Sequence, residues 1–561
     1  MSTICSPGLL RPGGLTKWTA TLVLALACAL ALAGCSRIST SVGRSSGNPW
    51  THHGVLRIGS YEELDNLNPL LSTELFVSDV CQMLYSGLID YDDNGEMIPD
   101  VALAVPSLRN GGIGKDGKTI TYHLRHSVMF SDGAPLTAAD VKFTWQQLMN
   151  PANIVSTRYP YDDVASIDTP DPYTVIVHLK RPLAPFVGFF MRDGILGAIL
   201  PKHLLEGNAD LNHNPFNLHP IGSGPFVVQS YQPGVLLMLR ANPRYWRGPP
   251  KLRSIEYHII PNQNTLLANV GSHEIDFYFD APEVQYKLLK AIAGVRVTAR
   301  PNQSFEHISF NCAKPPFDDV RVRQAIAYAI DWQRLVRDVY LNLGLPGMAD
   351  IAPTSWAYDA SVKPYPHDLA RARALLAQAG WLAGPDGILV KDGRPFSVTI
   401  TTTTGVTSRA KVEELIQQDL RQVGIDLTVH NDHANMLFAV YGANGVFARG
   451  RFEIGLYAWA YTIPEPDNTQ TLGPDQIPPH GQNYTYLADP LIGQFQQMAR
   501  TNYDRAIRRA AIVRMQRREH EMVPRHTIIW RANVDAVNTD MKNFKPAPAV
   551  SDFWNSWEWE I

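Results

Sequence analysis

Hydrophobic residues recur along the chain at two spacings, one typical of strands and the other of helices. In FSVTITTTTG (residues 396–405) and IDLTVH (residues 425–430), apolar and polar residues alternate with a period of two, which predicts strands. The segment between them has helical spacing, and Gly424 is expected to end its helix. Its apolar face consists of Val412, Leu415, Ile416, Leu420 and Val423. Strand, helix and strand in this order predict a βαβ unit with parallel strands, and hence an α/β fold.

Two further helices are marked by residues that commonly begin and end helices. One is predicted to begin at Thr137, whose spacing from Asp140 matches a capping box, and to stop before Pro151. The other is predicted to begin at Asp368 and to end at Gly380. The chain contains no repeat and no heptad array, so strands and helices are expected to mix throughout.

The stretch GIGKDGKT (residues 112–119) matches the pattern of a P-loop, which would bind the phosphates of ATP. A P-loop needs a helix that begins at its lysine. After Lys118, however, apolar and polar residues alternate, which predicts a strand, and Asp116-Gly117 is typical of a turn. We therefore interpret the stretch as a surface turn that leads into a strand. The glycines of IGSGPF (residues 221–226) are likewise interpreted as structural.

The N-terminal residues 1–34 have the composition of a secretory signal. Arg11 and Lys17 precede an apolar run that ends in LAGC. This ending resembles the bacterial lipoprotein signal, in which Cys35 becomes the first mature residue and carries acyl chains. An uncleaved membrane anchor is the alternative, but the run is short for a span of about 20 residues. Residues 35–49 are polar and rich in glycine and serine, which predicts a flexible tether to the periplasmic or extracellular face of a membrane.

Length and charge narrow the possible partners of the mature chain. Removing 34 of the 561 residues leaves 527, more than one hydrophobic core can hold, so at least two lobes are expected. Removing Arg11 and Lys17 changes the formal net charge from −3 to about −5. Because nucleic-acid-binding domains usually carry a clustered basic face, nucleic acid is not expected as a partner. Cys81 and Cys312 either form a disulfide or remain thiols.

No pattern of catalytic or metal-binding residues stands out in the sequence. The pair His52-His53 and the residues His123 and His126 lack cysteine or carboxylate partners at ligand spacing. His520, between Glu519 and Glu521, is expected on the solvated face of a helix. We therefore expect neither a cofactor nor an enzymatic activity. The C-terminal FWNSWEWEI (residues 553–561) alternates apolar and polar residues, which predicts a half-buried strand.

Several long blocks of the sequence resemble the large extracellular solute-binding proteins of peptide-type and nickel-type ABC importers. The blocks are LYSGLIDYDDNGEMIPDVA, DGKTITYHLRHSVMFSDGAPLTAADVKFTW, IGSGPFVVQSY with ANPRYWRGPP, and SFNCAKPPFDDVRVRQAIAYAID. The resemblance implies a two-lobed α/β clamp of type II, with an extra subdomain and a hinge of two crossover segments. Lobe one would comprise residues 50–305 and 524–561, the extra subdomain about 82–215, and lobe two residues 306–523.

The resemblance also implies a set of ligand-binding residues. In peptide-binding members, an aspartate shortly before a Pro-Asp-Asn sequence pairs with the α-amino group of the ligand. Here Thr462 occupies the position of that aspartate, so the expected anchor is missing. Glu465 or Asp467 either replaces it or braces the loop. Without such a carboxylate, a desolvated ammonium would be costly to bind.

Four aromatic residues and one asparagine complete this set. Trp459 and Tyr461 project from one side of a predicted strand and either line the cleft or pack in the core. Trp356 and Tyr358 occupy positions that lie near the ligand in the family, and packing is again the alternative. Asn68 belongs to a loop that touches ligand in the family, or to a plain turn.

The function implied by the resemblance is that of a lipid-anchored, monomeric receptor. It would bind an oligopeptide or a similar small solute between the lobes and deliver it to the permease subunits of an ABC importer, whose other subunits would hydrolyse ATP. Because Thr462 replaces the aspartate, a nickel chelate, haem or an oligosaccharide remains an alternative ligand. A secreted nucleotide hydrolase that uses the P-loop match is the rival from another functional class.

Overall fold

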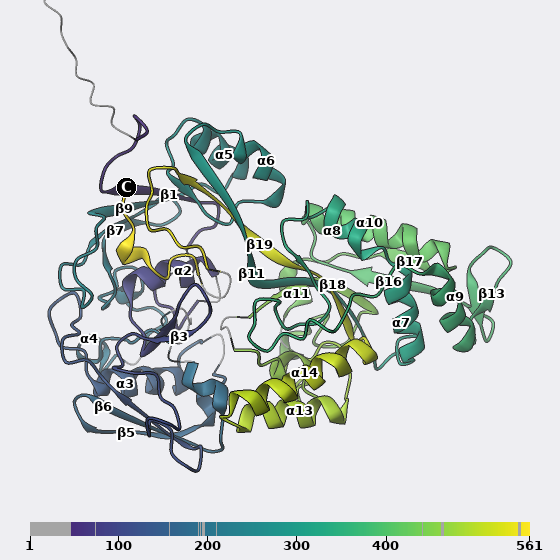
Figure 1. Ribbon diagram of the computed structural model, residues 1–561, viewed down its shortest axis with the longest axis horizontal. Helices are drawn as coiled ribbons and strands as arrows, with labels where there is room; N and C mark the ends of the chain where they lie inside the picture. The colour runs from purple at the N-terminus through teal and green to yellow at the C-terminus, as the bar shows by residue number, and fades with distance from the viewer. Residues whose placement is uncertain are drawn as a thin grey trace, which may run out of the picture. The chain divides into compact units, whose positions relative to one another are not determined.

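The structure is a computed structural model, in which residues 50–561 form one unit (Figure 1). It describes residues 47–561 except 65, 73–74, 156–157, 189, 191, 193–196, 209, 440, 462–464 and 548–550. Among the expected site residues, Cys35 and Thr462 therefore lie outside the described residues, as do the predicted signal and most of the predicted tether. None of the described helices is long and apolar enough to cross a membrane.

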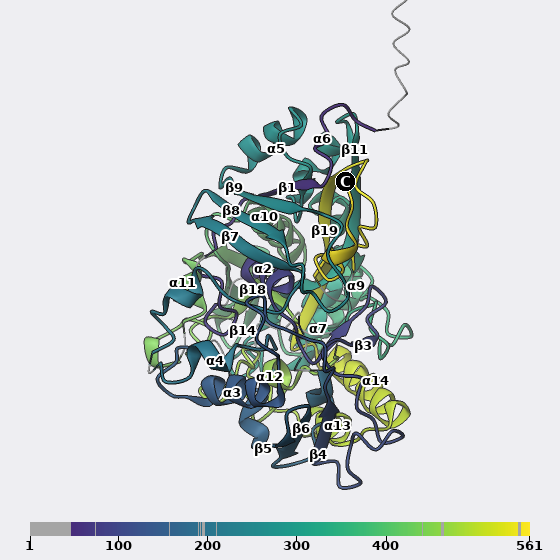
Figure 2. The same cartoon turned by 90° about the vertical axis from the view of Figure 1, so that its left-hand side faces the viewer.

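One large mixed sheet of 11 strands runs through residues 55–538. Its strands, in spatial order, are β17 (Asp426–Val429), β16 (Ser397–Thr401), β18 (Ile454–Ala460), β11 (Val295–Phe310), β19 (Arg525–Asn538), β10 (Phe277–Tyr278), β1 (Val55–Ser60), β9 (Ser254–Ile259), β8 (Leu236–Ala241) and β7 (Phe226–Gln232), with β12 (Leu345–Pro346) paired to β19. Figure 2 shows β7, β8, β9 and β1 side by side at one end of this order.

The two long strands β11 and β19 carry the chain from one half of the sheet to the other. They pair antiparallel from Val295 opposite Asn538 to Ser309 opposite Arg525. The first part of β11 pairs with the end of β19, and this end of β19 also pairs with β10. The last seven residues of β11 pair with β18, which lies along the opposite edge of β11 from β19. The register of the pair shifts around Phe305, where β11 passes between the two halves.

Each half of the sheet has a hydrophobic core of its own. The first core packs α2 (Leu75–Leu84) and α3 (Ala138–Met149) with β1, β8 and β9, and it includes apolar residues from 537 to 561. The second packs α7 (Val320–Ala329), α8 (Trp332–Asp338), α9 (Leu369–Gln378) and α10 (Thr407–Gln422) on β16 to β18. The two cores share no buried residue.

A third group of helices packs together at residues 490–522. The helices α13 (Pro490–Thr501) and α14 (Arg505–Met522) bury Ile492, Ala511 and Met515 in a small cluster that also includes apolar residues from 351–357 and Leu472. Helix α13 contacts η2 (Ala184–Gly188). The pair therefore links the second half of the chain to residues far away in the sequence.

The remaining elements are short. The other helices are α4 (Lys202–Leu205), α5 (Gln263–Gly271), α6 (Tyr286–Lys290), α11 (Ala434–Leu437) and α12 (Thr469–Leu472), with the 3₁₀ turns η1 (Tyr161–Asp163), η3 (Pro215–Asn217), η4 (Glu283–Gln285), η5 (Tyr441–Ala443) and η6 (Ser556–Glu558). The other strands are β2 (Ile89–Tyr91), β3 (Met97–Pro99), β4 (Thr119–His123), β5 (Val164–Asp171), β6 (Thr174–Leu179), β13 (Leu382–Ala383), β14 (Leu389–Lys391) and β15 (Arg394–Pro395).

The predicted βαβ unit and helices are confirmed. Strands β16 and β17 pair in parallel, and α10 connects them. All five residues of the predicted apolar face are buried, and Gly424 follows with a φ of +83°. In α3, the backbone N–H of Thr137 donates to the carboxylate of Asp140 at 2.8 Å, as in a capping box. Asp368 caps α9 by accepting from the N–H of Arg371 at 2.8 Å.

The P-loop-like stretch is a turn that leads into a strand, as predicted. The N–H of Gly117 donates to the carbonyl of Gly114 at 2.9 Å, and β4 begins two residues later. Lys118 is exposed, and its backbone N–H donates to the carboxylate of Asp116 at 3.0 Å. Since no helix starts at Lys118, the geometry of a phosphate-binding P-loop is absent from this described segment.

The glycines of residues 221–226 are required by close packing, which confirms their structural interpretation. A Cβ atom on Gly222 would lie 1.9 Å from the carbonyl oxygen of Leu84, at the end of α2. A Cβ atom on Gly224 would lie 2.5 Å from the carbonyl carbon of the same residue. Only glycine lets these two backbone segments approach so closely.

Two local predictions near the C-terminus are wrong. Residues 556–558 form the 3₁₀ turn η6, and the only pairing nearby is an isolated bridge between Lys542 and Glu560 among the described residues. The alternation seen in the sequence reflects instead the burial of Trp559 and Ile561 in the first core. Glu519 is also fully buried rather than on a solvated helix face, and the ring of His520 stacks on Tyr365 at 4.4 Å. Tertiary packing overrides the local pattern at both places.

A stack of alternating arginine and tryptophan side chains fastens the C-terminal segment to the first half. The guanidinium groups of Arg192 and Arg247 lie 4.9 and 4.6 Å from the ring centroid of Trp557. Arg247 and Arg125 lie 4.3 and 4.4 Å from the ring of Trp246. Nearby, the backbone N–H of Gly54 donates to the carbonyl of Ile561 at 3.0 Å. Such cation–π contacts are strongest when water is excluded.

Candidate functional site

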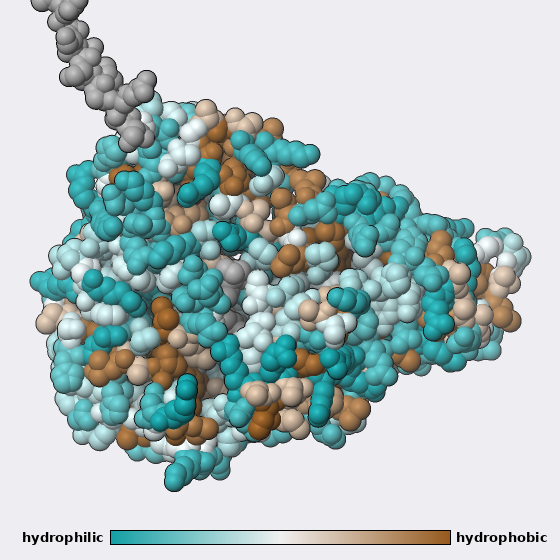
Figure 3. Space-filling view, viewed as in Figure 1, coloured by the Kyte–Doolittle hydropathy of each residue, from teal (hydrophilic) through white to brown (hydrophobic). Residues whose placement is uncertain are grey.

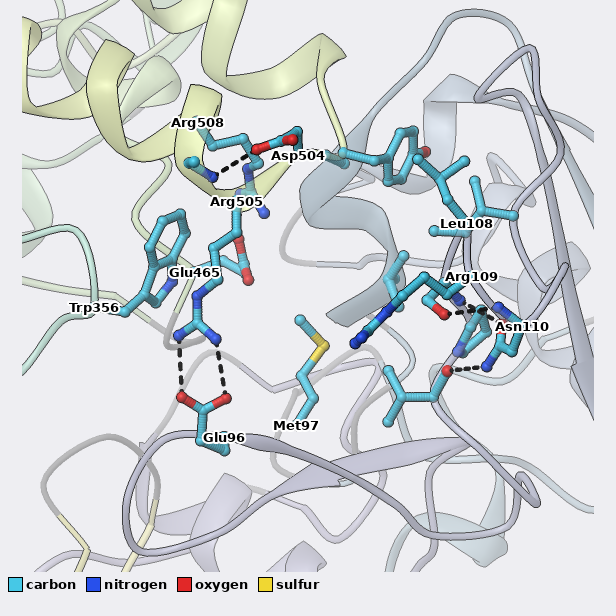
Figure 4. Close-up of a pocket in the computed structure, with 18 of the residues that line it drawn as sticks. Glu96, Met97, Leu108, Arg109, Asn110, Trp356, Glu465, Asp504, Arg505 and Arg508 are labelled. Atoms are coloured by element: carbon cyan, nitrogen blue, oxygen red, sulfur yellow. Dashed lines mark hydrogen bonds and ion pairs between the residues drawn. The ribbon is translucent and has the colours of Figure 1, made fainter.

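A cavity of about 760 Å³ lies between segments that are far apart in the sequence. One wall comes from β2 and β3, from residues 105–113 and from η2. The opposite wall comes from Trp356, Glu465 and residues 503–508 at the start of α14 (Figure 4). Its volume lies within the range of about 300–1,000 Å³ that is typical of small-molecule pockets.

The start of α14 places two arginines at this cavity. Asp504 caps the helix, because its carboxylate accepts from the backbone N–H groups of Ala506 and Ile507 at 2.8 and 3.2 Å. Residues three positions apart share one face of a helix. Arg505 and Arg508 therefore both project toward the cavity, and Figure 4 shows them on the same side of α14.

These arginines pair with carboxylates in two different environments. Arg505 donates two hydrogen bonds to Glu96 of the opposite wall, at 3.0 and 3.2 Å, and both side chains are more than half exposed. Arg508 pairs with Glu465, and both of these side chains are buried. An exposed pair contributes only up to about 1 kcal/mol, whereas a buried charge is costly without its partner. Trp356 lies beneath both guanidinium groups, at 4.9 and 5.3 Å.

Further contacts join Asp467, Arg500 and Tyr503 to the same region of residues 96–190. The hydroxyl of Tyr159 donates to the carboxylate of Asp467 at 2.7 Å. Arg500 lies 3.9 Å from that carboxylate and 4.0 Å from Asp163. The hydroxyl of Tyr503 donates to the carbonyl of Gly117 at 2.9 Å, on the P-loop-like turn. The two walls of the cavity are thus held together by contacts between the chain's own residues.

The described part of the loop at residues 465–468 is anchored by a buried carboxylate. Asp350 is fully buried and accepts from the hydroxyl of Tyr461 at 2.7 Å and from the amide of Asn468 at 3.0 Å. Arg525 of β19 pairs with Asp350 and also with Glu519, the latter at 2.7 Å. This network connects the loop to the strand that crosses between the halves.

Two carboxylates share the one guanidinium of Arg525. Burial, together with the negative charge of Asp350, raises the pKa of Glu519 to about 8. One oxygen of Glu519 accepts from Arg525, and the other has no hydrogen-bond partner among the described residues. Glu519 is therefore largely protonated at neutral pH, which avoids a second buried negative charge.

The residues expected to bind ligand occupy different surroundings. Trp356 lines the cavity, whereas Tyr358 is half-buried and its carbonyl accepts from Arg509 at 3.4 Å. The ring of Tyr461 stacks on Phe305 at 5.8 Å and its hydroxyl is bound to Asp350. The role of these three residues toward a ligand stays a prediction.

Three other expected residues already have partners within the chain. Trp459 is half-buried and lies 6.5 Å from Tyr484, edge to face. The side chain of Asn68 is fully buried and donates to Asn217 at 3.0 Å. Asp467 accepts from Tyr159 and from the N–H of Thr469 at 3.0 Å. Their roles, like that of Thr462 outside the described residues, stay predictions.

Sequence reasoning missed the charged residues of the cavity. Glu96, Arg109, Arg505 and Arg508 come from segments up to about 400 residues apart, so no local motif joins them. One signal was present in the sequence: Asp504 followed by arginines one and four positions later is typical of a capped helix that presents two cations on one face.

Metal ligands do not gather anywhere in the described part of the chain. It contains no group of three or more His, Cys, Asp or Glu side chains that could hold a metal ion. Cys81 and Cys312 are both thiols, and the Sγ of Cys81 donates to the carbonyl of Leu67 at 3.6 Å. The question left open by the sequence is thus answered in favour of thiols.

Comparison with known proteins agrees with the architecture. The profile of the family described as bacterial extracellular solute-binding proteins, family 5 Middle, matches residues 96–473. Over 421 residues the chain is 32% identical to the oligopeptide-binding protein AppA of Bacillus subtilis (strain 168), covering 73% of this chain and 75% of that protein. Over 372 residues it is 30% identical to the glutathione-binding protein GsiB of Salmonella choleraesuis (strain SC-B67), covering 66% of this chain and 68% of that protein.

Solved structures give the same picture. AppA from Bacillus subtilis in complex with a nonapeptide superposes with a TM-score of 0.74 at 27% identity, covering 90% of this chain and 98% of that one. NikA from Brucella suis in complex with Fe(III)-EDTA superposes with a TM-score of 0.77, covering 90% of this chain and 99% of that one. At 21% identity, the second likeness shows the fold alone.

Proposed function

Since the chain belongs to the bacterial extracellular solute-binding proteins of family 5, we propose that it binds an oligopeptide or a peptide-like small solute and delivers it to a membrane permease. The resemblance seen in the sequence is confirmed by the family match, and so is the two-lobed α/β fold. The chain is the substrate-binding component of an ABC importer and not an enzyme. The solute, the anchor and the permease contact belong to the proposal.

The observation that supports solute binding is the cavity between the two walls. Lobe one in this proposal comprises residues 50–305 and 524–561, with an extra subdomain at about 82–215, and lobe two comprises residues 306–523. The cavity is lined by residues of both. A solute that contacts both lobes only when they are closed shifts the population toward the closed form. The permease then distinguishes the closed, loaded receptor from the open one.

The hinge of this clamp is proposed to lie where β11 and β19 pass between the halves. Each half has its own hydrophobic core, so the two can move as bodies. The register shift around Phe305 marks a point at which the strand pair is irregular. Irregular strand pairs bend more easily than regular ones, which favours a hinge at this point.

The proposed anchor is a lipid on Cys35. The motif LAGC and the polar segment at residues 35–49 support it. Mass spectrometry of the mature protein from a bacterial host is expected to show an N-terminal Cys35 that carries acyl chains. Cys35→Ala is expected to abolish acylation without loss of solute binding. An N-terminus that retains residues 1–34 would contradict this part of the proposal.

A thermal-shift screen tests solute binding directly. The set would include dipeptides to nonapeptides, glutathione, nickel–histidine chelates and oligosaccharides. A ligand at 100 times its Kd stabilises the folded protein by about 2.7 kcal/mol, which is a readily measured shift. Stabilisation by peptides would support the proposal, and a set in which nothing binds would refute it.

A solute other than a peptide is the second candidate. Glu465 is paired with Arg508, and Asp467 with Tyr159, so neither carboxylate is left over for an α-amino group in this conformation. The proteins in the comparison bind diverse solutes: a nonapeptide, glutathione, and an iron chelate in NikA. If only non-peptide members of the set stabilise the protein, the receptor function stands and the peptide assignment does not.

A further inference from the structure

We infer that the interlobe cavity selects solutes that carry a carboxylate, which is bound by Arg109, rather than solutes held by an ammonium group. This inference rests on the proposed function, because it names the class of solute for the same cavity. It concerns a residue that no family position or sequence motif singles out.

The position of Arg109 is fixed by the turn that carries it. The side chain of Asn110 accepts from the backbone N–H groups of Ser107 and Gly112, at 2.9 and 3.0 Å, and donates to the carbonyl of Val105 at 2.9 Å. These three bonds hold residues 105–112 in one conformation. Figure 4 shows that the side chain of Arg109 extends from this turn into the cavity, toward Met97.

The charges that line the cavity leave one cation without a counter-ion. Arg505 is neutralised by Glu96, and Arg508 by Glu465. The remaining carboxylate, Asp504, accepts from two backbone N–H groups of α14, so its charge is balanced by the helix N-terminus.

Arg109 makes no hydrogen bond or ion pair with any residue in the described part of the chain. The five N–H donors of its guanidinium are therefore available to a ligand. A carboxylate matches this group in charge and in bidentate geometry.

An ammonium group would find no equivalent partner at this cavity. Only Glu96, whose pair with Arg505 is exposed, could exchange its partner for an ammonium ion at low cost, and that exchange would release Arg505 as a second uncompensated cation in the cavity. Breaking the buried pair of Arg508 and Glu465 would leave a buried guanidinium uncompensated, which is costly. An ammonium would also experience repulsion from Arg109. The electrostatic balance therefore favours an anion.

The other walls suit the apolar part of such a solute. Met97 and Trp356 line the cavity beside the charged groups. A thioether and an indole ring accept varied apolar shapes. The exposed pair of Arg505 and Glu96 can open at low cost, and its arginine would then add donors for a second anionic group.

The experiment compares binding of acids with that of their neutral counterparts by isothermal titration calorimetry. The probes are peptides of two to five residues, their C-terminal amides and their N-acetyl forms, glutathione and its diethyl ester, and neutral oligosaccharides. We expect the acids to bind, the amides and the ester to bind roughly tenfold to hundredfold more weakly, and N-acetylation to leave affinity unchanged.

Arg109→Gln isolates the contribution of the guanidinium. We expect this substitution to weaken binding of the acids roughly tenfold or more and to leave binding of the neutral counterparts unchanged. Removing the guanidinium from the protein and removing the carboxylate from the ligand should therefore not have additive effects on affinity. Arg296→Gln, at an exposed arginine on β11, is the matched control and is expected to change neither. Unfolding midpoints without solute show that both variants fold.

Each outcome decides one of the two proposals. If acids and neutral counterparts bind alike, or if only neutral solutes bind, the inference is overturned while the receptor function stands. Equal binding of the acids to wild type and Arg109→Gln would also overturn it. If none of the probes binds, the proposed function itself fails, and the inference fails with it.

Discussion

The buried carboxylate of Glu519 makes stability depend on pH in a direction opposite to that of most carboxylates. Its pKa is about 8 in the folded protein against an ordinary value of 4.5. Because the folded state keeps a proton that the unfolded state releases, stability from this group is fully present below about pH 4.5 and is lost as the pH rises to about 8. We predict that Glu519→Gln removes this loss.

The size of the effect follows from the pKa difference and from the surroundings of Glu519. One pKa unit corresponds to about 1.4 kcal/mol, so the wild type loses on the order of a few kcal/mol between pH 5 and pH 8. Glutamine keeps an oxygen that can accept from Arg525, as the carboxylate does at 2.7 Å. At pH 5 the variant and the wild type are therefore expected to be about equally stable, and at pH 8 the variant more stable.

Urea denaturation at pH 5, 6, 7 and 8 measures this difference. Glu521→Gln serves as the control, because Glu521 lies two residues away and its side chain is exposed. We expect the difference in unfolding free energy between Glu519→Gln and the wild type to grow with pH, and that of the control to stay constant. Parallel curves for Glu519→Gln and wild type would refute the assignment of a raised pKa to this group.

Two further predictions concern packing and closure. Gly222→Ala is expected to destabilise the protein by about 1–3 kcal/mol, because the new Cβ atom would clash with the carbonyl of Leu84. Urea denaturation measures this loss, and Gly271→Ala is the control because a Cβ atom there has open space. Tyr159→Phe removes the hydrogen bond to Asp467 that helps to hold the walls of the cavity together. This variant is expected to weaken solute binding about tenfold, as hydrogen bonds to charged groups contribute about 1.5–3 kcal/mol. Unchanged affinity in calorimetry would mean that this contact does not help to hold the cavity together.

Sequence patterns predicted the parts of the fold that depend on local spacing. The βαβ unit at residues 396–430 and the capped helix α3 follow from residues within one or two turns of each other. The prediction of a C-terminal strand is wrong because the same alternation of apolar and polar residues arises when Trp559 and Ile561 pack in a core built from distant residues. Periodicity records which side chains are buried, and a 3₁₀ turn can bury them as well as a strand can.

The candidate site was harder to predict, for a physical reason. The residues nominated from the family segment around Asp467 include some whose side chains are already bound to other residues of the chain, such as Tyr461 to Asp350. The cavity is instead lined by charges whose pairing depends on tertiary structure, such as Glu96 with Arg505. A sequence shows that a charged residue is present, but only the structure shows whether its charge is already compensated.

The contacts of the last residues affect when the receptor can fold. Strand β10 pairs with β19, and Gly54 donates to the carbonyl of Ile561. Residues 537–561 complete the core around β1, so this core lacks part of its interior until they have been synthesised. Long-range contacts of this kind slow folding. The first core of an emerging chain would thus stay incomplete until the last residues had been made, whereas the second core, which uses none of them, could form earlier.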